Sequence, residues 1–125
     1  MNLCMSHCVF PALDINATAN FYVTCLGFKR VDFLNAIEPH ICLYRDAIEI
    51  ILTQSKGQSV IPNRELYGYG YDAYFITDNQ QVLQDEFEKS NVKIIRRLQK
   101  TDYHNHEFVV EGIDGRWIGF GIKEE

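Results

Sequence analysis

The feature that most constrains the fold of this chain is a strand-helix-strand pattern that occurs twice. In the first copy, residues 7–28, a short apolar stretch leads to Asp14, an amphipathic segment follows, and Gly27 comes after it. An aspartate side chain accepts hydrogen bonds from the free amides of a first helical turn, and glycine readily takes the left-handed conformation beyond the last turn. These two residues predict a helix over residues 15–26.

The second copy, residues 75–95, shows the same signals at the same spacing. Asp78 corresponds in position to Asp14. Asn91, which tolerates the left-handed region, corresponds to Gly27. Both segments carry apolar residues at helical spacing, and each is followed by a lysine and an apolar, β-branched or aromatic run. The two copies agree in the capping residue, in the residue that ends the helix, in the length of the helix and in the strand that follows. This agreement predicts an internal duplication.

Alternating apolar residues predict eight strands, four in each copy. The strands span about residues 3–13, 28–33, 41–44, 47–53, 71–76, 92–96, 107–111 and 116–122. Module one therefore covers about residues 3–53, a linker covers about 54–70, and module two covers about 71–122. The expected fold class is α+β, with two βαβββ modules in a single domain of residues 1–125.

Composition narrows the class of protein and its partners. The 125 residues are 46% hydrophobic and carry a net charge of −5, which suits a globular domain that needs no disulfide framework. No run of eighteen apolar residues and no signal peptide are present, so we expect a cytoplasmic protein without a membrane span. The acidic balance argues against nucleic acid, and the basic cluster Lys93, Arg96, Arg97 and Lys100 is interpreted as a solvated strand.

The order of these motifs resembles the vicinal oxygen chelate superfamily of glyoxalases, ring-opening dioxygenases and bleomycin-resistance proteins, and is nearest in look to the last branch. Such chains have an Asp, a helix with Phe-Tyr, a Leu-Gly-Phe ending, and later a Glu-Phe strand and an Asp-Gly turn. The matching residues are Asp14, Phe21, Tyr22, Leu26, Gly27, Phe28, Glu107, Phe108, Asp114, Gly115 and Phe120. The resemblance implies two sheets that form an open cup, and a homodimer, because bleomycin-binding relatives build crevices between paired chains.

The resemblance also implies where a metal would be held. Metal-using members have a His at the head of the first strand, a second ligand at the head of the fifth, and a carboxylate on the last strand of each module. His7 and Glu49 fit the first module, but Tyr71 and Gly119 occupy the positions of the second. Two ligands are fewer than the three that a catalytic divalent ion normally has, so we expect no metal and no cofactor. Substitute ligands that stay open are Tyr71 for iron, Asp72, His106 and Glu107.

Strand alternation predicts an aromatic cup. It places four aromatic residues on the side of the sheets that carries Glu49, namely Phe33, Tyr71, Phe75 and Trp117. It places Phe28, Tyr74, Ile118 and Phe120 under the helices. Glu49 is a carboxylate within an apolar strand, so we expect it to meet water, a donor, a cation or a ligand. Tyr67, Tyr69 and Tyr71, which alternate with glycines at the end of the linker, form either a mobile aromatic rim or a packing loop.

An aromatic cup with one acidic group suits a planar aromatic or cationic ligand. No nucleophile motif, paired acid-base carboxylates or phosphate-binding loop is present. We therefore expect non-catalytic binding of a small aromatic or cationic compound, similar to antibiotic sequestration by bleomycin-resistance proteins, with no catalytic residues. The alternative, an enzyme, would be a metal-dependent glyoxalase-like lyase or dioxygenase with His7 and Glu49 as metal ligands.

Overall fold

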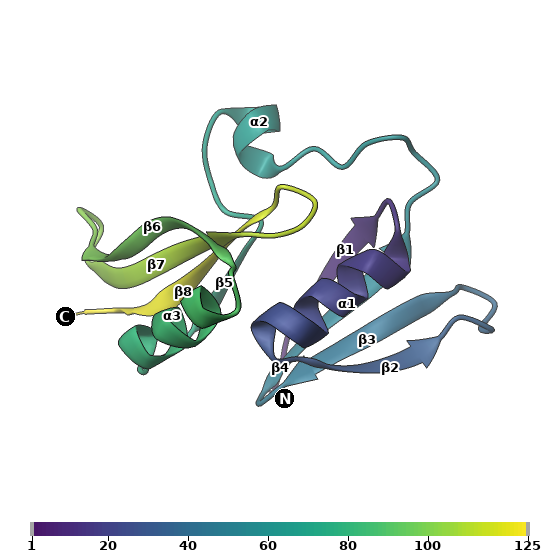
Figure 1. Cartoon of the computed structure of the whole chain (residues 1–125), viewed down its shortest axis with the longest axis horizontal. Coiled ribbons are helices and arrows are strands. Elements are labelled where there is room, and N and C mark those ends of the chain that lie inside the picture. The colour runs from purple at the N-terminus through teal and green to yellow at the C-terminus, as the bar shows by residue number, and fades with distance from the viewer. Residues whose placement is uncertain (1, 125) are drawn as a thin grey trace. The chain divides into compact units, whose positions relative to one another are not determined.

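Each predicted module folds as a four-stranded sheet with one long helix (Figure 1). The computed structural model describes residues 2–124, and the chain divides into two compact units, Met1–Val60 and Ile61–Glu125. The first unit contains β1 Cys8–Ala12, α1 Ile15–Leu26, β2 Lys29–Phe33, β3 His40–Arg45 and β4 Ile48–Gln54. The second contains α2 Asn63–Tyr67, β5 Ala73–Ile76, α3 Gln80–Lys89, β6 Lys93–Lys100, β7 Asn105–Glu111 and β8 Trp117–Lys123.

The two sheets have the same topology. Their strand orders are β1-β4-β3-β2 and β5-β8-β7-β6. In each sheet the first strand runs parallel to the last, and the other pairs are antiparallel. A parallel pair needs a long crossover connection, which includes α1 in one unit and α3 in the other. The predicted α+β fold with two βαβββ modules is confirmed.

The first helix begins and ends where the sequence predicted. The Asp14 carboxylate accepts a hydrogen bond from the backbone N–H of Ala17 at 3.0 Å, and Gly27 has a φ of 76°. Both ends of α1 are therefore specified by residues within or next to the helix.

The second helix differs at its start. Asn79, with no side-chain capping bond, is the N-cap residue of α3, and its own N–H donates to the Thr77 hydroxyl at 3.1 Å. The prediction that Asp78 repeats the role of Asp14 is therefore wrong. At the other end Asn91 has a φ of 62°, as its match to Gly27 predicted.

Each long helix covers one face of its own sheet (Figure 1). In the second unit this interface includes an aromatic cluster of Phe75, Phe87, Phe108 and Phe120. The rings of Phe108 and Phe120 stack with centroids 5.2 Å apart. The face beneath α3 is therefore filled by side chains and offers no space for a ligand between the helix and the sheet.

Phe75 lies in this core, which corrects the prediction that it faces the pocket. It is 7% exposed, and its ring centroid is 5.7 Å from that of Phe120. Tyr74, predicted to lie under the helix, is instead on the opposite face with Tyr71. The error arises because strand β5 begins at Ala73, so Tyr71 precedes the strand and does not follow its alternation.

The predicted linker contains a short helix, α2, which is a second correction. The Asp72 carboxylate accepts a hydrogen bond from the backbone N–H of Asn63 at 2.9 Å, and the Asn63 side chain donates to the Tyr71 carbonyl at 3.0 Å. Gly68 ends the helix with a φ of 95°. Because Asp72 holds α2 from outside the segment, the composition of residues 54–70 does not show the helix.

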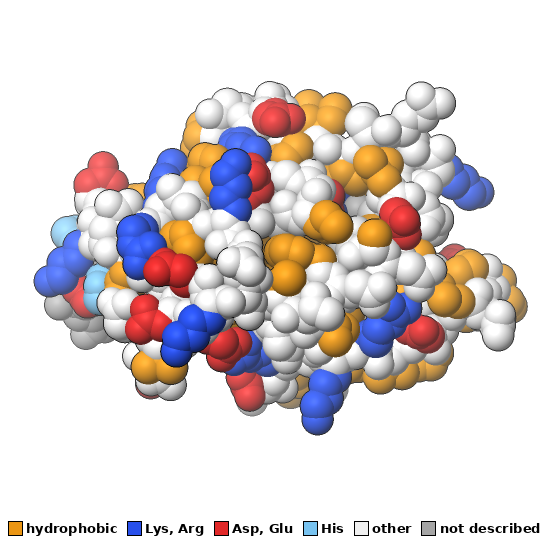
Figure 2. Space-filling model, viewed as in Figure 1, with side chains coloured by type: hydrophobic (Ala, Val, Ile, Leu, Met, Phe, Trp, Pro, Cys, Tyr) orange, Lys and Arg blue, Asp and Glu red, His pale blue; other side chains and the backbone are white. Residues whose placement is uncertain are grey.

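The surface mixes charges of both signs. On the face that Figure 2 shows, Lys and Arg side chains are interspersed with Asp and Glu. That face lacks the extended basic surface that binding to a phosphate backbone requires. Within residues 2–124, no helix is both long and apolar enough to span a bilayer.

Candidate functional site

A cavity of about 530 Å³ opens in the second unit. We call it the aromatic pocket, and its lining is Arg64, Gly68, Tyr69, Gly70, Tyr71, Arg96, Tyr103 and Trp117. Its volume lies within the range of small-molecule sites, about 300–1,000 Å³. Four of the eight lining residues are aromatic, so the pocket offers the ring faces that bind planar compounds.

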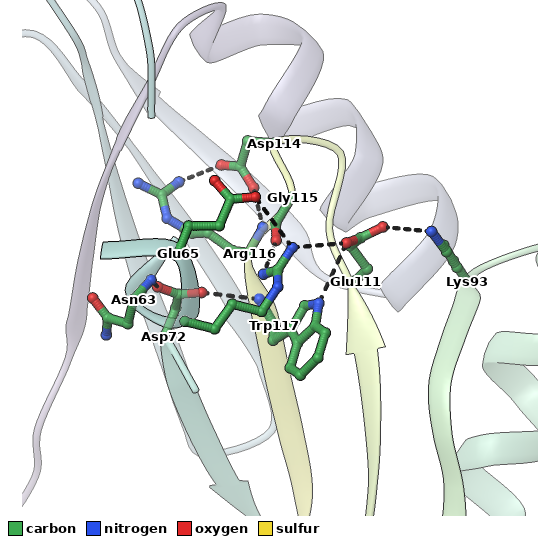
Figure 3. Close-up of polar contacts among 10 residues, drawn as sticks. Asn63, Glu65, Asp72, Lys93, Glu111, Asp114, Gly115, Arg116 and Trp117 are labelled. Carbon is green, nitrogen blue, oxygen red and sulfur yellow. Dashed lines mark hydrogen bonds and ion pairs between the residues drawn. The ribbon is translucent and has the colours of Figure 1, made fainter. Parts of the chain in front are cut away.

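Trp117, the first residue of β8, is held at two points. Its backbone N–H donates to the Asp72 carboxylate at 2.9 Å, and its indole Nε1 donates to Glu111 at 3.3 Å. Figure 3 shows both contacts, with the half-buried indole beside Glu111. A ring fixed in this way is preorganised for a ligand, because little side-chain freedom remains to be lost on binding.

Two arginines lie over the Trp117 ring. The Arg64 guanidinium carbon is 4.3 Å from the ring centroid, and that of Arg96 is 5.3 Å away. Arg64 also donates to the Gly115 carbonyl at 2.6 Å and to Glu111 at 3.1 Å. Both distances to the ring suit cation-π attraction, so this indole already has two cationic neighbours.

Glu111 links several of these groups. It lies 3.0 Å from the Lys93 ammonium and accepts hydrogen bonds from Arg64 and Trp117 (Figure 3). Burial alone would raise the pKa of Glu111, but the hydrogen bonds from Lys93 and Trp117 and the charges of Lys93 and Arg64 outweigh it and lower the pKa below its usual value. Glu111 is therefore ionised at neutral pH and fixes the indole.

A second carboxylate, Glu107, lies behind the pocket wall. It is 1% exposed and accepts hydrogen bonds from the hydroxyls of Tyr71, Tyr74 (3.2 Å) and Tyr103 (3.1 Å) and from the Asn105 amide (3.2 Å). Four donors compensate the cost of burying this side chain. The pKa of both Tyr71 and Tyr74 is raised above its usual value, mainly by burial and to a smaller extent by Glu107. The cluster thus keeps Tyr71 and Tyr74 neutral, and its hydrogen bonds hold Tyr71 and Tyr103 in the pocket wall.

Glycines in β8 make room for this cluster. A Cβ atom at Gly119 would lie 2.6 Å from the Tyr74 ring, and one at Gly121 would lie 2.5 Å from the Tyr74 hydroxyl and from the His106 carbonyl. Gly119 is the position where the resemblance places a metal-binding carboxylate. The Tyr74 ring fills that space, so a longer side chain has no room there.

The residues present do not fit a metal centre. In the first unit, His7 Nδ1 lies 3.3 Å from Glu49 Oε1, so these two candidate ligands contact each other. Throughout residues 2–124, no three His, Cys, Asp or Glu side chains are placed to hold one ion. The expectation that no metal or cofactor binds stays a prediction.

The structure brings together two of the predicted ligand-binding residues, Tyr71 and Trp117, which both line the aromatic pocket. Phe33 and Glu49 belong to the first unit and lie at opposite ends of its sheet. Phe33 pairs with His40 and stacks on its ring, with centroids 5.1 Å apart, whereas Glu49 pairs with Tyr44 at the other end of β3. The ligand-binding roles of these residues stay predictions.

Sequence reasoning missed three lining residues, Arg64, Arg96 and Tyr103. Arg64 lies on α2, in the segment that the sequence predicts to be a linker. Arg96 had been interpreted as part of a solvated strand, and Tyr103 lies in the loop between β6 and β7. Their residue types were the only signal, because Tyr and Arg are enriched at binding surfaces.

Comparison with solved structures finds the same fold in proteins of low sequence identity. UcmS2 superposes with a TM-score of 0.74 at 17% identity, over 97% of this chain and 98% of UcmS2. TnmS3, an antibiotic binding protein from Streptomyces sp. CB03234, gives 0.71 at 14% identity, over 98% of this chain and 100% of TnmS3. A glyoxalase/bleomycin resistance protein/dioxygenase superfamily member from Sphaerobacter thermophilus DSM 20745 gives 0.72 at 15% identity, over 95% and 97% of the two chains.

Comparison with curated protein sequences finds no match. A family model, in contrast, matches residues 5–120, which is nearly the whole chain. That model describes the superfamily which the capped helix, the Leu-Gly-Phe ending and the Asp-Gly turn resemble. The chain therefore belongs to the glyoxalase/bleomycin resistance protein/dioxygenase superfamily.

Proposed function

We propose that this protein binds a small planar aromatic compound, without chemical conversion, in the aromatic pocket of its second unit. The observation that carries the proposal is the fixed Trp117 indole in the wall of a cavity of about 530 Å³. The hydroxyls of Tyr71 and Tyr103, two further lining residues, are also held, by Glu107. A planar ligand would stack on rings that need little rearrangement, so binding would cost little conformational entropy.

The titrating groups of the pocket favour binding over catalysis. A general base must accept a proton near neutral pH, but the pKa of Tyr71 is raised by burial and by Glu107, so this phenol keeps its own proton. The oxygens of Glu107 and Glu111 already accept several hydrogen bonds each. The likeness of the fold to TnmS3, an antibiotic binding protein, supports antibiotic capture as the biological purpose of such binding.

A ligand screen tests this proposal directly. We expect a planar aromatic antibiotic to raise the melting temperature, because a ligand at a hundred times its Kd stabilises the folded state by about 2.7 kcal/mol. Trp117 is the only tryptophan in the chain, so its fluorescence reports occupancy of the pocket. The panel should include bleomycin-type glycopeptides, anthraquinones and divalent metals.

Substitution of Trp117 locates the site. We expect Trp117→Ala to weaken binding by about 1–3 kcal/mol, the usual cost of removing an aromatic anchor. Tyr67→Ala is the matched control, because Tyr67 is 70% exposed and does not line the pocket. Affinity that is equal in Trp117→Ala and in the unmodified protein would place the ligand elsewhere, and a screen without any stabilising aromatic compound would refute the proposal.

A further inference from the structure

The charge of the aromatic pocket differs from the charge that the sequence suggested. Its lining contains two arginines, Arg64 and Arg96, and no Asp or Glu of residues 2–124 belongs to it. A cationic ligand would meet two guanidinium groups, and Arg64 already lies over the Trp117 ring that would attract such a ligand. Like charges in a partly enclosed site repel, so the pocket disfavours the cationic compound that Glu49 had suggested.

The two arginines are in different states. Arg64 is committed to the protein, because its guanidinium donates to the Gly115 carbonyl and to Glu111. The Arg96 side chain contacts the Trp117 ring but makes no hydrogen bond or ion pair with any residue that the structure describes. Arg96 is therefore a cation in the pocket lining whose donors are available to a ligand.

The other basic residues of β6 all have acidic partners. The pairs are Lys93 with Glu111 at 3.0 Å, Lys100 with Glu124 at 3.4 Å, and Arg97 with Glu88. Arg96 thus differs from these three residues in two ways, since it lines the aromatic pocket and its side chain has no carboxylate partner among the described residues.

An irregularity in β6 turns Arg96 towards the pocket. Ile94 pairs with Val110, but Arg96, two residues further on, pairs with Val109, only one residue away on β7. A regular ladder would place Arg96 opposite Phe108, whose ring packs in the core beneath α3. One extra residue reverses the face on which the following side chains lie, so this bulge moves Arg96 from the helix side to the pocket side.

We infer that the compound bound in the aromatic pocket is an acidic aromatic molecule, whose ring lies against Trp117 and the tyrosines and whose anionic group pairs with Arg96. The inference rests on the proposed function and adds the chemical class of the ligand. A guanidinium matches a carboxylate with two parallel hydrogen bonds, and such charge-assisted bonds are stronger than neutral ones. In the free protein the same guanidinium remains solvated, because Arg96 is exposed.

Three probes with one ring system separate charge from stacking. We would titrate anthraquinone-2-carboxylate, anthraquinone-2-carboxamide and 2-(aminomethyl)anthraquinone into the full chain, following Trp117 fluorescence and heat. We expect the carboxylate to bind about tenfold or more tightly than the amide, and the ammonium to bind most weakly. The affinity of the carboxylate should fall as NaCl rises from 50 to 500 mM, and that of the amide should not.

Arg96→Gln is the decisive variant. It should lower the affinity for the carboxylate to that for the amide and leave the amide unchanged, whereas Arg96→Lys should retain part of the preference. Arg97→Gln is the matched control. It removes the same charge from the next residue in the chain, whose side chain pairs with Glu88. Melting temperatures equal to that of the unmodified protein would show that the variants fold.

The outcomes distinguish this inference from the proposed function. An amide or ammonium that binds as tightly as the carboxylate, or equal losses for carboxylate and amide in Arg96→Gln, would overturn the acidic class and leave aromatic binding intact. A selective loss in Arg97→Gln would also overturn it. Failure of all three probes to bind would overturn both the inference and the proposed function.

Discussion

Gly119→Ala tests the packing that closes the predicted metal position. The added Cβ would lie 2.6 Å from Cδ2 and 2.9 Å from Cε2 of the Tyr74 ring, closer than such atoms pack. Gly119 does not have a positive φ, so an alanine there adopts the same backbone without strain. Any loss of stability must therefore come from the contact with Tyr74 and not from the main chain.

The expected loss follows from what the Tyr74 ring can do. If the ring stays, overpacking costs about 1–3 kcal/mol. If it moves, its hydroxyl loses the 3.2 Å hydrogen bonds with Glu107 and Asn105, and a bond to a charged group is worth about 1.5–3 kcal/mol. These are alternatives and do not add, so we expect a destabilisation of about 2 kcal/mol.

Urea unfolding followed by circular dichroism measures this loss from the midpoint and the slope. Gly57→Ala is the matched control, because the nearest atom to its new Cβ would be 3.5 Å away, and we expect it to be neutral or to stabilise by up to about 1 kcal/mol. Tyr74→Ala removes the ring that the new Cβ would contact. In that background Gly119→Ala should therefore lower the free energy of unfolding by at least about 1 kcal/mol less than it does in the unmodified protein. A loss below about 0.5 kcal/mol in Gly119→Ala, or simple additivity in the double variant, would refute the reasoning.

Three further predictions concern pH and metals. Burial and Glu107 raise the pKa of Tyr71 and Tyr74 in the folded protein, so the stability linked to their neutral form is complete below the unfolded pKa of about 10 and is lost as pH rises above it. The free energy of unfolding should therefore fall less steeply between pH 9 and 11 in Tyr71→Phe and in Tyr74→Phe than in the unmodified protein. The pKa of Glu111 is lowered in the folded protein, so its contribution to stability is complete above about pH 4.3 and is lost as pH falls through the folded pKa. In Glu111→Gln the melting temperature should therefore change less between pH 5 and pH 3 than in the unmodified protein. An equal change in the two proteins would contradict the ion pair with Lys93. Elemental analysis should find Ni, Zn, Fe and Mn far below one per chain, whereas one equivalent that is lost in His7→Ala would favour the metal-dependent enzyme.

The fold was predictable where its signals are local. Asp14 caps α1 through its own side chain, and Gly27 and Asn91 both have the left-handed conformation that their residue types favour. The prediction failed for α2, because the residue that holds the start of this helix, Asp72, lies nine residues further along the chain. The segment contains a C-terminal signal, Gly68, but no side chain of its own that caps the start of the helix.

Alternation identified Trp117 because β8 pairs with β7 without interruption, so its inward and outward positions follow the sequence. It placed Phe75 wrongly, since the alternation was counted from Tyr71, which precedes the ladder of β5 and does not follow its alternation. It gave no indication of Arg96, because the bulge in β6 exists only as a mismatch between two paired strands. The direction of Arg96, the basic residue of the aromatic pocket whose donors are available, therefore depends on the partner strand. This is why sequence reasoning identified the aromatic residues Tyr71 and Trp117 but not the basic group beside them.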